Sequence, residues 1–388
     1  MTGRDAFPVG GSTTLQQLEA DPHPQLQQLQ ATEPVSWVPA IGGWLVTGRD
    51  LGIAVMRDAS TYTVDDPRFS TGQVIGPSML SLDGAEHLRH REPFVDQYRA
   101  GAVRSRLSAW TTARATELVA DMQKAGHAEL RSELAAPLAA AVMTEALALD
   151  GVGTPELLGW YDEIVAGVDA ITAGHGVPDE ALEAFGELKA AVLVTMEANP
   201  GSPIAAVAST GRLTVDEIVS NVAVLLFGGI VTSEGTMGTL FHQMLQHPDQ
   251  LEMVRKRPEL AAAAVDEALR FEPAAAVVDR YATGDTQLGS ADIRSGELVR
   301  VSLSAASRDP SVFEQPEEFD ILRSNAPQHL AFARGPHACL GLHLARLEAR
   351  IALEVLIEEL SDIQLDPEAT EGPVGLIFRG PRAVGARW

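Results

Sequence analysis

Residues 332–341 read Phe332-Ala-Arg-Gly335-Pro-His337-Ala-Cys339-Leu-Gly341 and contain the only cysteine of the chain. The apolar spacing of the next segment, Leu342–Leu360, predicts a helix. N–H groups at a helix start favour negative charge on a nearby sulfur, and a thiol with a pKa of about 8.5 needs such help to lose its proton. The two glycines permit a tight backbone path that aims amides at the sulfur, and we expect Phe332 to cover it.

A lone cysteine has two other interpretations. It is often a small buried side chain that only packs. It can also be the nucleophile of a hydrolase, with His337 or His343 as base. Nothing that resembles an oxyanion loop accompanies these histidines, so the pattern favours a thiolate that ligates a metal.

Composition limits the class of protein. The chain has 388 residues and a formal net charge of −24, which argues against nucleic-acid binding because phosphate contacts need clustered Lys and Arg. One cysteine cannot form an internal disulfide. We find no basic segment followed by an apolar run at the N-terminus and no stretch of about 18 uninterrupted apolar residues. We therefore expect a cytoplasmic protein without a membrane anchor.

The pattern along the chain predicts a mainly α fold with a small β region. We expect residues 1–12 to form a flexible N-terminus and residues 13–388 a single domain. Val35–Trp37 and Trp44–Val46 suggest a hairpin, and Asp58–Ala85 suggests a long functional loop. Further expected helices are Ala102–Lys124, Ser132–Ala148, Pro155–Ile171 and Asp179–Ala198; further expected strands are Val277–Ala282, Leu298–Leu303 and Leu376–Ala386.

One expected helix is unusually long. Thr214 and Glu217 form a possible capping box ahead of Val215–Gln246. At 1.5 Å per residue this helix is roughly 48 Å long and crosses the whole domain. Its middle, Val222–Ile230, is nearly all apolar, so we expect it to be buried.

The cysteine segment resembles the haem-binding loop of cytochromes P450, Phe-x-x-Gly-x-x-x-Cys-x-Gly. It departs from the family at Ala333, where a glycine is usual. Three more segments resemble the family in the same order along the chain. They are His87-x-x-x-Arg91; Glu267-Ala-Leu-Arg270 followed by Phe271-Glu-Pro273 and Arg280-Tyr-Ala-Thr283; and Ser307-Arg-Asp-Pro310 with Phe313, Pro316, Phe319-Asp320 and Arg323.

The resemblance implies a cytochrome P450 fold and heme b as cofactor, with Cys339 as the axial iron ligand. Two propionates bring two negative charges into an apolar pocket, and Arg and His are natural partners for them. The residues implied to bind the cofactor are His87, Arg91, Arg280, Phe332, His337, Cys339 and Gly341.

The long helix carries Gly228-Gly229-Ile230-Val231-Thr232-Ser233, where the family has its oxygen-activating segment. The resemblance implies catalytic roles for Gly229, Thr232 and Ser233. Two glycines in mid-helix cost roughly 1 kcal/mol each relative to alanine, so they either open a groove for dioxygen or mark a close helix contact. The family's acid is replaced by Val231, which cannot carry a proton.

Three hypotheses address proton delivery without that acid. In the first, which we favour, Thr232, Ser233 and waters supply the protons. In the second, the reaction is a less usual one, such as coupling or a peroxide-driven oxidation. In the third, Glu234 has taken over the proton relay. Glu234 lies roughly 60° from the direction of Val231 around the helix.

The resemblance also implies a monooxygenase that inserts one atom of O2 into a small or medium apolar organic substrate. The alternative is a haem-binding protein without turnover. The candidate pocket residues are Ile75, Met79, Phe227, Val231, Val277, Val278 and Phe378. We expect electrons to come from a separate ferredoxin and ferredoxin reductase, docked on a basic patch formed by Arg89, Arg104, Arg106, Arg346 and Arg350.

Overall fold

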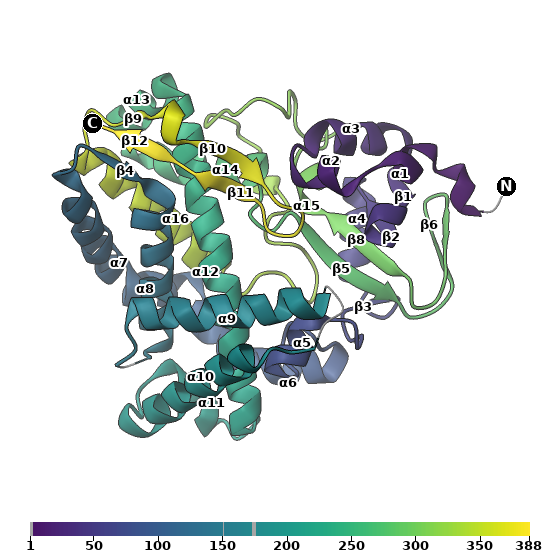
Figure 1. The fold of residues 1–388 in the computed structure, drawn as a ribbon, viewed down its shortest axis with the longest axis horizontal. Coiled ribbons are helices and arrows are strands. Elements are labelled where there is room, and N and C mark those ends of the chain that lie inside the picture. The colour runs from purple at the N-terminus through teal and green to yellow at the C-terminus, as the bar shows by residue number, and fades with distance from the viewer. Residues whose placement is uncertain (1–2, 150, 173–175) are drawn as a thin grey trace.

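A computed structural model of the chain describes residues 3–149, 151–172 and 176–388. It is mainly helical with small sheets, as the sequence predicts (Figure 1). The α-helices are α1 (Pro8–Ser12), α2 (Leu15–Glu19), α3 (His23–Thr32), α4 (Arg49–Arg57), α5 (Ser70–Ile75), α6 (Gly84–Val95), α7 (Ala100–Gln123), α8 (Ala136–Leu147), α9 (Thr154–Thr172), α10 (Asp179–Ala198), α11 (Pro203–Ser209), α12 (Val215–Gln246), α13 (Pro248–Lys256), α14 (Ala261–Phe271), α15 (Leu303–Ala306) and α16 (Leu342–Glu359).

The strands lie mostly toward the N-terminal end of the molecule, beside α1–α4 (Figure 1). They are β1 (Val35–Val38), β2 (Gly43–Val46), β3 (Tyr62–Thr63), β4 (His127–Glu129), β5 (Val277–Ala282), β6 (Thr286–Leu288), β7 (Ala291–Ile293), β8 (Leu298–Ser302), β9 (Gln364–Leu365), β10 (Glu371–Val374), β11 (Gly380–Ala383) and β12 (Gly385–Arg387). The largest sheet has the order β1-β2-β8-β5-β3 and is antiparallel except where β2 pairs with β8. The predicted hairpin of β1 and β2 is confirmed.

Helix α12 runs through the middle of the helical part (Figure 1). Its capping box is present: Thr214 Oγ1 accepts from the N–H of Glu217 at 3.3 Å, and Glu217 Oε2 accepts from the N–H of Thr214 at 2.8 Å. By length and composition α12 is able to cross a membrane, but most of its side chains pack inside the protein. It is therefore the central core helix.

Two expectations are corrected. The described part of residues 1–12 is not free, because Phe7 is buried against Trp44 and the N–H groups of Val9 and Gly10 donate to Glu33. The segment Asp58–Ala85 is not one long loop, since it contains β3 and α5. Short elements in Gly- and Pro-rich sequence carry little periodicity, so only their tertiary contacts reveal them.

Glu267 and Arg270 of α14 form a fully buried ion pair, with both side chains 0% exposed. Two N–H···O bonds of 2.7 Å join them. Glu267 also accepts from the N–H of Asp320 at 2.9 Å and from Arg323 at 3.2 Å, while Arg270 donates to the carbonyl of Pro316 at 2.8 Å. This network fastens the segment before the cysteine loop to α14, so it is a structural brace and not a surface ion pair.

We predict that Glu267→Gln lowers the free energy of unfolding by about 3–5 kcal/mol, because it leaves the buried Arg270 charge unpaired. Urea denaturation measures this change. The control is Glu117→Gln on α7, which breaks an exposed pair of the same helical spacing with Arg114 and should change stability little. Equal effects in the two variants would contradict the role of the brace.

Candidate functional site

The cysteine loop is fixed by close backbone contacts. Gly335 has φ +80° and an added Cβ would lie 2.2 Å from the carbonyl oxygen of Met56, so only glycine fits there. Ala333 also lies in the left-handed region, with φ +53°, which explains why glycine is usual at this place. The N–H of Cys339 donates to the carbonyl of Phe332 at 2.9 Å. The loop thus holds the cysteine directly before α16.

Cys339 is half-buried, and opposing effects act on its sulfur. Burial raises the pKa of the thiol, whereas the N–H of Gly341 and the charges of Arg91 and Arg346 act in the opposite direction. Coordination to a metal cation removes such a thiol proton outright. The ring of Phe332 contacts Arg346, whose guanidinium carbon lies 4.7 Å from the ring centre.

The predicted propionate-binding residues come together around Asp83. His337 Nε2 lies 2.8 Å from Asp83 Oδ1, and the rings of His87 and His337 are 4.3 Å apart. Arg91 donates to the carbonyl of Ala338 at 2.6 Å. Arg280 is buried, and burial lowers its pKa while Asp83 partly offsets the effect. Residues from three separate segments thus lie close together: residues 83–91, β5 and the cysteine loop.

Three side chains of this cluster have polar groups without a counter-charge or hydrogen-bond partner among the described residues. His87 is 1% exposed, its Nε2 has no hydrogen-bond partner among the described residues, and burial lowers its pKa to about 4. Arg91 and Arg280 form no ion pair within the part of the chain that the structure describes. Buried cations are normally paired. A dianionic group such as the two haem propionates supplies what is missing, so the residues fit a haem with Cys339 as its sulfur ligand.

One face of α12 is accessible although the helix lies in the core. Phe227, Gly228, Gly229, Val231, Thr232, Glu234 and Gly235 are partly or fully accessible, while Ile230, Ser233 and most of the remaining residues of the helix are buried. The spacing of Phe227, Gly228, Val231, Thr232 and Gly235 places these five on one side of the helix. An accessible stripe in the middle of a core helix indicates an internal space beside it.

The two glycines of α12 have different surroundings. A Cβ on Gly228 would meet nothing within 4 Å, whereas a Cβ on Gly229 would lie 2.3 Å from Met143 Sδ of α8. Each of the two alternatives therefore holds at one glycine: Gly228 faces open space, and Gly229 permits close packing of two helices. Thr232 Oγ1 donates to the carbonyl of Gly228 at 2.5 Å, so its hydroxyl lies on the open side.

Two carboxyl groups near the accessible part of α12, those of Glu234 and Glu348, have different hydrogen-bond partners. Glu234 pairs with Arg131 at 2.5 Å, and burial raises its pKa. Because its carboxylate is ion-paired with Arg131, Glu234 is poorly suited to deliver protons in place of the family's acid. Ser233 is 5% exposed and donates to Glu348 of α16 at 2.9 Å, a contact that spans 115 residues of sequence.

The predicted pocket residues separate into two groups. Phe227 stacks edge-on against Phe378 with ring centres 5.4 Å apart, and Tyr161 lies 6.2 Å from Phe227. Val231 lies on the accessible face of α12. Val278 shares a face of β5 with Arg280, because side chains alternate along a strand. Phe227, Phe378 and Tyr161 thus form one aromatic group beside the accessible residues of α12.

The other three pocket predictions are corrected. Val277 points to the opposite face of β5 and lines a small hollow with Leu18, Leu26 and Leu45. Ile75 and Met79 are 1% and 4% exposed and belong to the main hydrophobic core. Alternation in a strand forbids Val277 and Val278 from lining the same pocket, which the sequence itself indicated.

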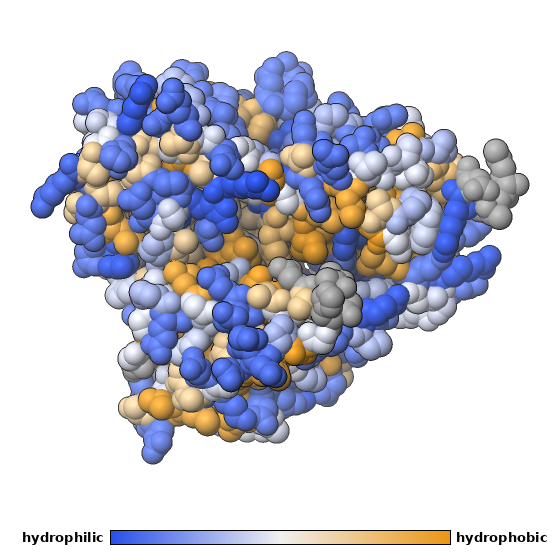
Figure 2. All heavy atoms as spheres, in the orientation of Figure 1, coloured by the Kyte–Doolittle hydropathy of each residue, from blue (hydrophilic) through white to orange (hydrophobic). Residues whose placement is uncertain are grey.

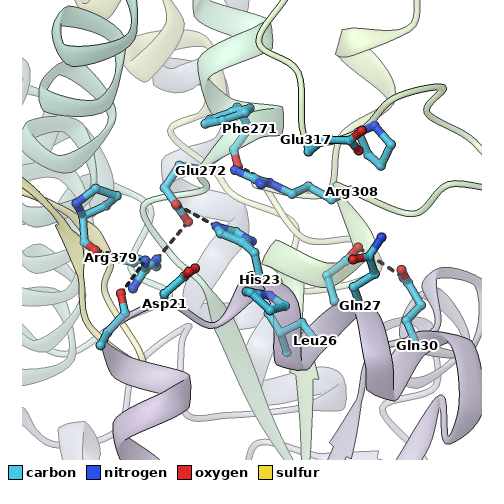
Figure 3. A pocket seen from close by; sticks show the side chains of 15 residues that line it. Asp21, His23, Leu26, Gln27, Gln30, Phe271, Glu272, Arg308, Glu317 and Arg379 are labelled. Atoms are coloured by element: carbon cyan, nitrogen blue, oxygen red, sulfur yellow. Dashed lines mark hydrogen bonds and ion pairs between the residues drawn. The ribbon is translucent and has the colours of Figure 1, made fainter. Parts of the chain in front are cut away.

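A second hollow of about 510 Å³ lies between α3, the end of α14 and the β10–β11 hairpin (Figure 3). Several of its charged groups have partners within the protein: Glu272 accepts from Arg379 at 3.0 Å and lies 2.9 Å from His23, and Arg308 donates to the carbonyl of Phe271 at 2.8 Å. These paired side chains connect distant segments, so we assign the hollow a structural origin.

Sequence reasoning missed Asp83, Tyr161 and Glu348. Asp83 accepts from Thr63 Oγ1 at 2.7 Å and from the N–H of Val64 at 2.8 Å besides facing His337, and these hydrogen bonds hold its pKa below the usual range despite burial. In the sequence, the only indication of a role for Asp83 was its position directly before α6. The contacts of Tyr161 and Glu348 are tertiary and leave no local pattern.

Comparison with known proteins agrees with this geometry. The family model described as Cytochrome P450 matches residues 195–373. The cytochrome P450 monooxygenase PikC of Streptomyces venezuelae is 30% identical over 96% of this chain and 92% of its own length. The biotin biosynthesis cytochrome P450 of Bacillus subtilis is 29% identical over 92% of this chain and 93% of its own length.

Solved structures give the same result. P450BioI, in a complex with a fatty-acid-loaded acyl carrier protein, is 27% identical and covers 95% of this chain and 98% of its own, with a TM-score of 0.86. CalO2 is 26% identical and covers 97% and 99%, with a TM-score of 0.87. Since a relative 30% identical is matched over nearly its whole length, this chain belongs to the cytochrome P450 family.

Proposed function

We propose that this P450 enzyme inserts one oxygen atom from O2 into a small or medium apolar organic substrate, by hydroxylation or a related oxidation. The observation that carries the proposal is the hydroxyl of Thr232 on the accessible face of α12. A protein that only carries haem needs no hydroxyl on this face. The bound haem supplies the activation of dioxygen, with Cys339 as ligand to its iron.

The residues around the haem divide the remaining work. Arg91, Arg280, His87 and His337 would hold the two propionates by charge-assisted hydrogen bonds. Val231 and Phe227 exclude bulk water from the oxygen side, and Thr232 positions a proton-bearing water there. Inserting one oxygen atom into the substrate requires two electrons and two protons. The supply of protons to the face of α12 that carries Thr232 therefore limits what the enzyme can do.

The aromatic pair Phe227 and Phe378, extended by Tyr161, supports an apolar substrate. Such sites are mostly apolar with a few polar groups. Relatives do not narrow the choice, since they include linalool 8-monooxygenase of Pseudomonas putida and 20-oxo-5-O-mycaminosyltylactone 23-monooxygenase of Streptomyces fradiae. Apolar side chains gather across the middle of one face of the molecule (Figure 2).

A ferredoxin, reduced by its reductase, is our proposed electron donor, in the cytoplasm. Arg104, His343, Arg346 and Arg350 line one hollow of about 190 Å³ between α7 and α16, on the side of Cys339. Clustered positive charge on an acidic protein attracts an acidic partner. Arg346 is paired with Asp266 and Arg350 with Glu354, so Arg104 is the arginine of this hollow without an ion pair among the described residues. Arg89, paired with Glu86 and Glu217, and Arg106, which donates to the carbonyl of Ala146 at 2.9 Å, do not line the hollow.

We predict that the haem-loaded, reduced protein shows the strongly red-shifted carbon monoxide absorbance band of thiolate-ligated haem. Cys339→Ser removes the sulfur and should abolish that band while the secondary structure, measured by circular dichroism, stays unchanged. A wild-type band at the shorter wavelength of imidazole-ligated haem would refute the ligand assignment.

We also predict that Arg104→Glu slows reduction by a ferredoxin about tenfold at low salt, and that the difference disappears at high salt. Arg104 is exposed and has no ion pair in the described structure, so its replacement leaves the core intact. Stopped-flow reduction measures the rate. The control is Arg114→Glu, farther along α7; an equal loss in this variant would mean that net charge, not the surface, sets the rate.

A further inference from the structure

The loop between β10 and β11 carries Phe378, an exposed aromatic residue at one end of the candidate pocket. Phe378 is 37% exposed, and its ring centre lies 5.4 Å from that of Phe227 on the accessible side of α12. Backbone hydrogen bonds tie residues 377–379 to residues 274–276. Surface loops are usually more mobile than the elements they connect. This loop is held further by side chains that lie outside the pocket.

Arg379, the residue after Phe378, is buried and uses every donor of its guanidinium group. Its Nε donates to Glu272 Oε1 at 3.0 Å. Its other two nitrogens donate to four backbone carbonyl oxygens, two at the end of α2 and two in the hairpin: Glu19 at 2.8 Å, Ala20 at 3.1 Å, Pro373 at 3.0 Å and Gly375 at 3.4 Å. Because a guanidinium group has five N–H donors in a fixed planar arrangement, Arg379 determines where the hairpin lies relative to α2.

Glu272, directly after α14, supplies the negative charge that pairs with this arginine (Figure 3). Both side chains are almost fully buried, with exposed fractions of 3% for Glu272 and 2% for Arg379. His23 Nε2 lies 2.9 Å from Glu272 Oε2. Burial raises the pKa of this carboxyl group, but neighbouring His23, Arg379 and Arg308 together hold the pKa below its usual range. We call Arg379, Glu272 and His23 the clamp.

Two glycines allow the backbone on either side of Phe378 to pack closely. Gly375 has φ +118°, and an added Cβ would lie 2.0 Å from the carbonyl oxygen of Phe378, so only glycine fits this turn. A Cβ on Gly235 of α12 would lie 3.5 Å from the carbonyl oxygen of Arg379. The hairpin therefore rests directly on the helix that forms the accessible side of the pocket.

We propose that Arg379 is a specificity-determining positioning residue: through the clamp it fixes the ring of Phe378 against Phe227, and so sets the space for a flat apolar part of the substrate. The inference deepens the proposed function and rests on it. Arg379 does not touch the substrate, because it acts through Phe378. Aromatic rings prefer edge-on and offset contacts with one another, so the substrate class is one that carries an aryl or similarly flat apolar group.

Imidazole probes test this proposal without a known substrate. An imidazole nitrogen binds the ferric iron of a haem protein and shifts the Soret band, so a titration gives its Kd. We compare imidazole with imidazoles that carry a phenyl group on alkyl chains of increasing length, using the haem-loaded full chain. Phe378→Ala should weaken binding of at least one phenyl probe by about 3- to 10-fold and leave the Kd of imidazole unchanged. The probe that responds most is used for the other variants.

Arg379→Lys keeps the positive charge but replaces the planar set of five donors by a single ammonium group. We expect the same loss of affinity for the phenyl probe, with the Kd of imidazole and the red-shifted carbon monoxide band unchanged. Adding Arg379→Lys to Phe378→Ala should cause no further loss, because both changes act on the same ring. Additive losses, or an equal loss for imidazole, would show that Arg379 only stabilises the fold and would overturn the proposal.

Gly375→Ala and Gly372→Ala form a matched pair that serves where Arg379→Lys does not fold. Gly375→Ala disturbs the turn beside Phe378 and should weaken the phenyl probe to a similar extent. A Cβ on Gly372 of β10 would meet nothing within 4 Å, so Gly372→Ala should bind every probe as the wild type does. Wild-type binding of the phenyl probe by Gly375→Ala would contradict control of the pocket by this hairpin.

The proposal and the proposed function fail in different ways. If no phenyl probe responds to Phe378→Ala, Phe378 does not border the bound ligand and the proposal for Arg379 is wrong. A wild-type protein that lacks the red-shifted carbon monoxide band would overturn the proposed function instead.

Discussion

The sulfur of Cys339 lies at the start of α16 in surroundings with more positive than negative charge. Arg91 and Arg346 approach it, and the Gly341 N–H points to it, yet burial still raises the pKa of the thiol. A bound metal cation resolves this conflict because it stabilises the thiolate directly. The strained turn at Ala333 and the close approach of Gly335 to Met56 are tolerated because they place the sulfur there.

Much of the remaining structure supports that loop. The buried network of Glu267, Arg270 and Arg323 fastens the preceding segment to the core. Asp83 holds His337 beside His87, which fixes the position of the cysteine loop relative to α6. The proximal side thus follows the family pattern. On α12, Val231 stands where the family usually has an acid, and Ser233 of the same helix donates to Glu348 of α16.

The sequence predicted the elements with strong periodicity well. The bounds of α10, α12 and β5 agree with expectation to the residue, because long apolar stripes, a capping box and β-branched runs dominate local preference. The motifs also located Cys339 and the cationic cluster. The resemblance singled out Val231 and Thr232, and both are partly accessible on α12.

Tertiary contacts explain the rest. No local pattern shows that Gly229 packs against Met143 while Gly228 faces space. Val277 failed as a pocket residue because it lies on the other face of its strand from Arg280. The link between Ser233 and Glu348 joins residues 115 positions apart, so it has no signature in sequence spacing.

X-ray absorption at the iron edge of the purified haem protein tests the central claim most directly. If Cys339 is the axial ligand, the first coordination shell of the iron contains one sulfur in addition to the porphyrin nitrogens, and Cys339→Ser loses that sulfur. A shell made only of nitrogen and oxygen in the wild-type protein would contradict the account.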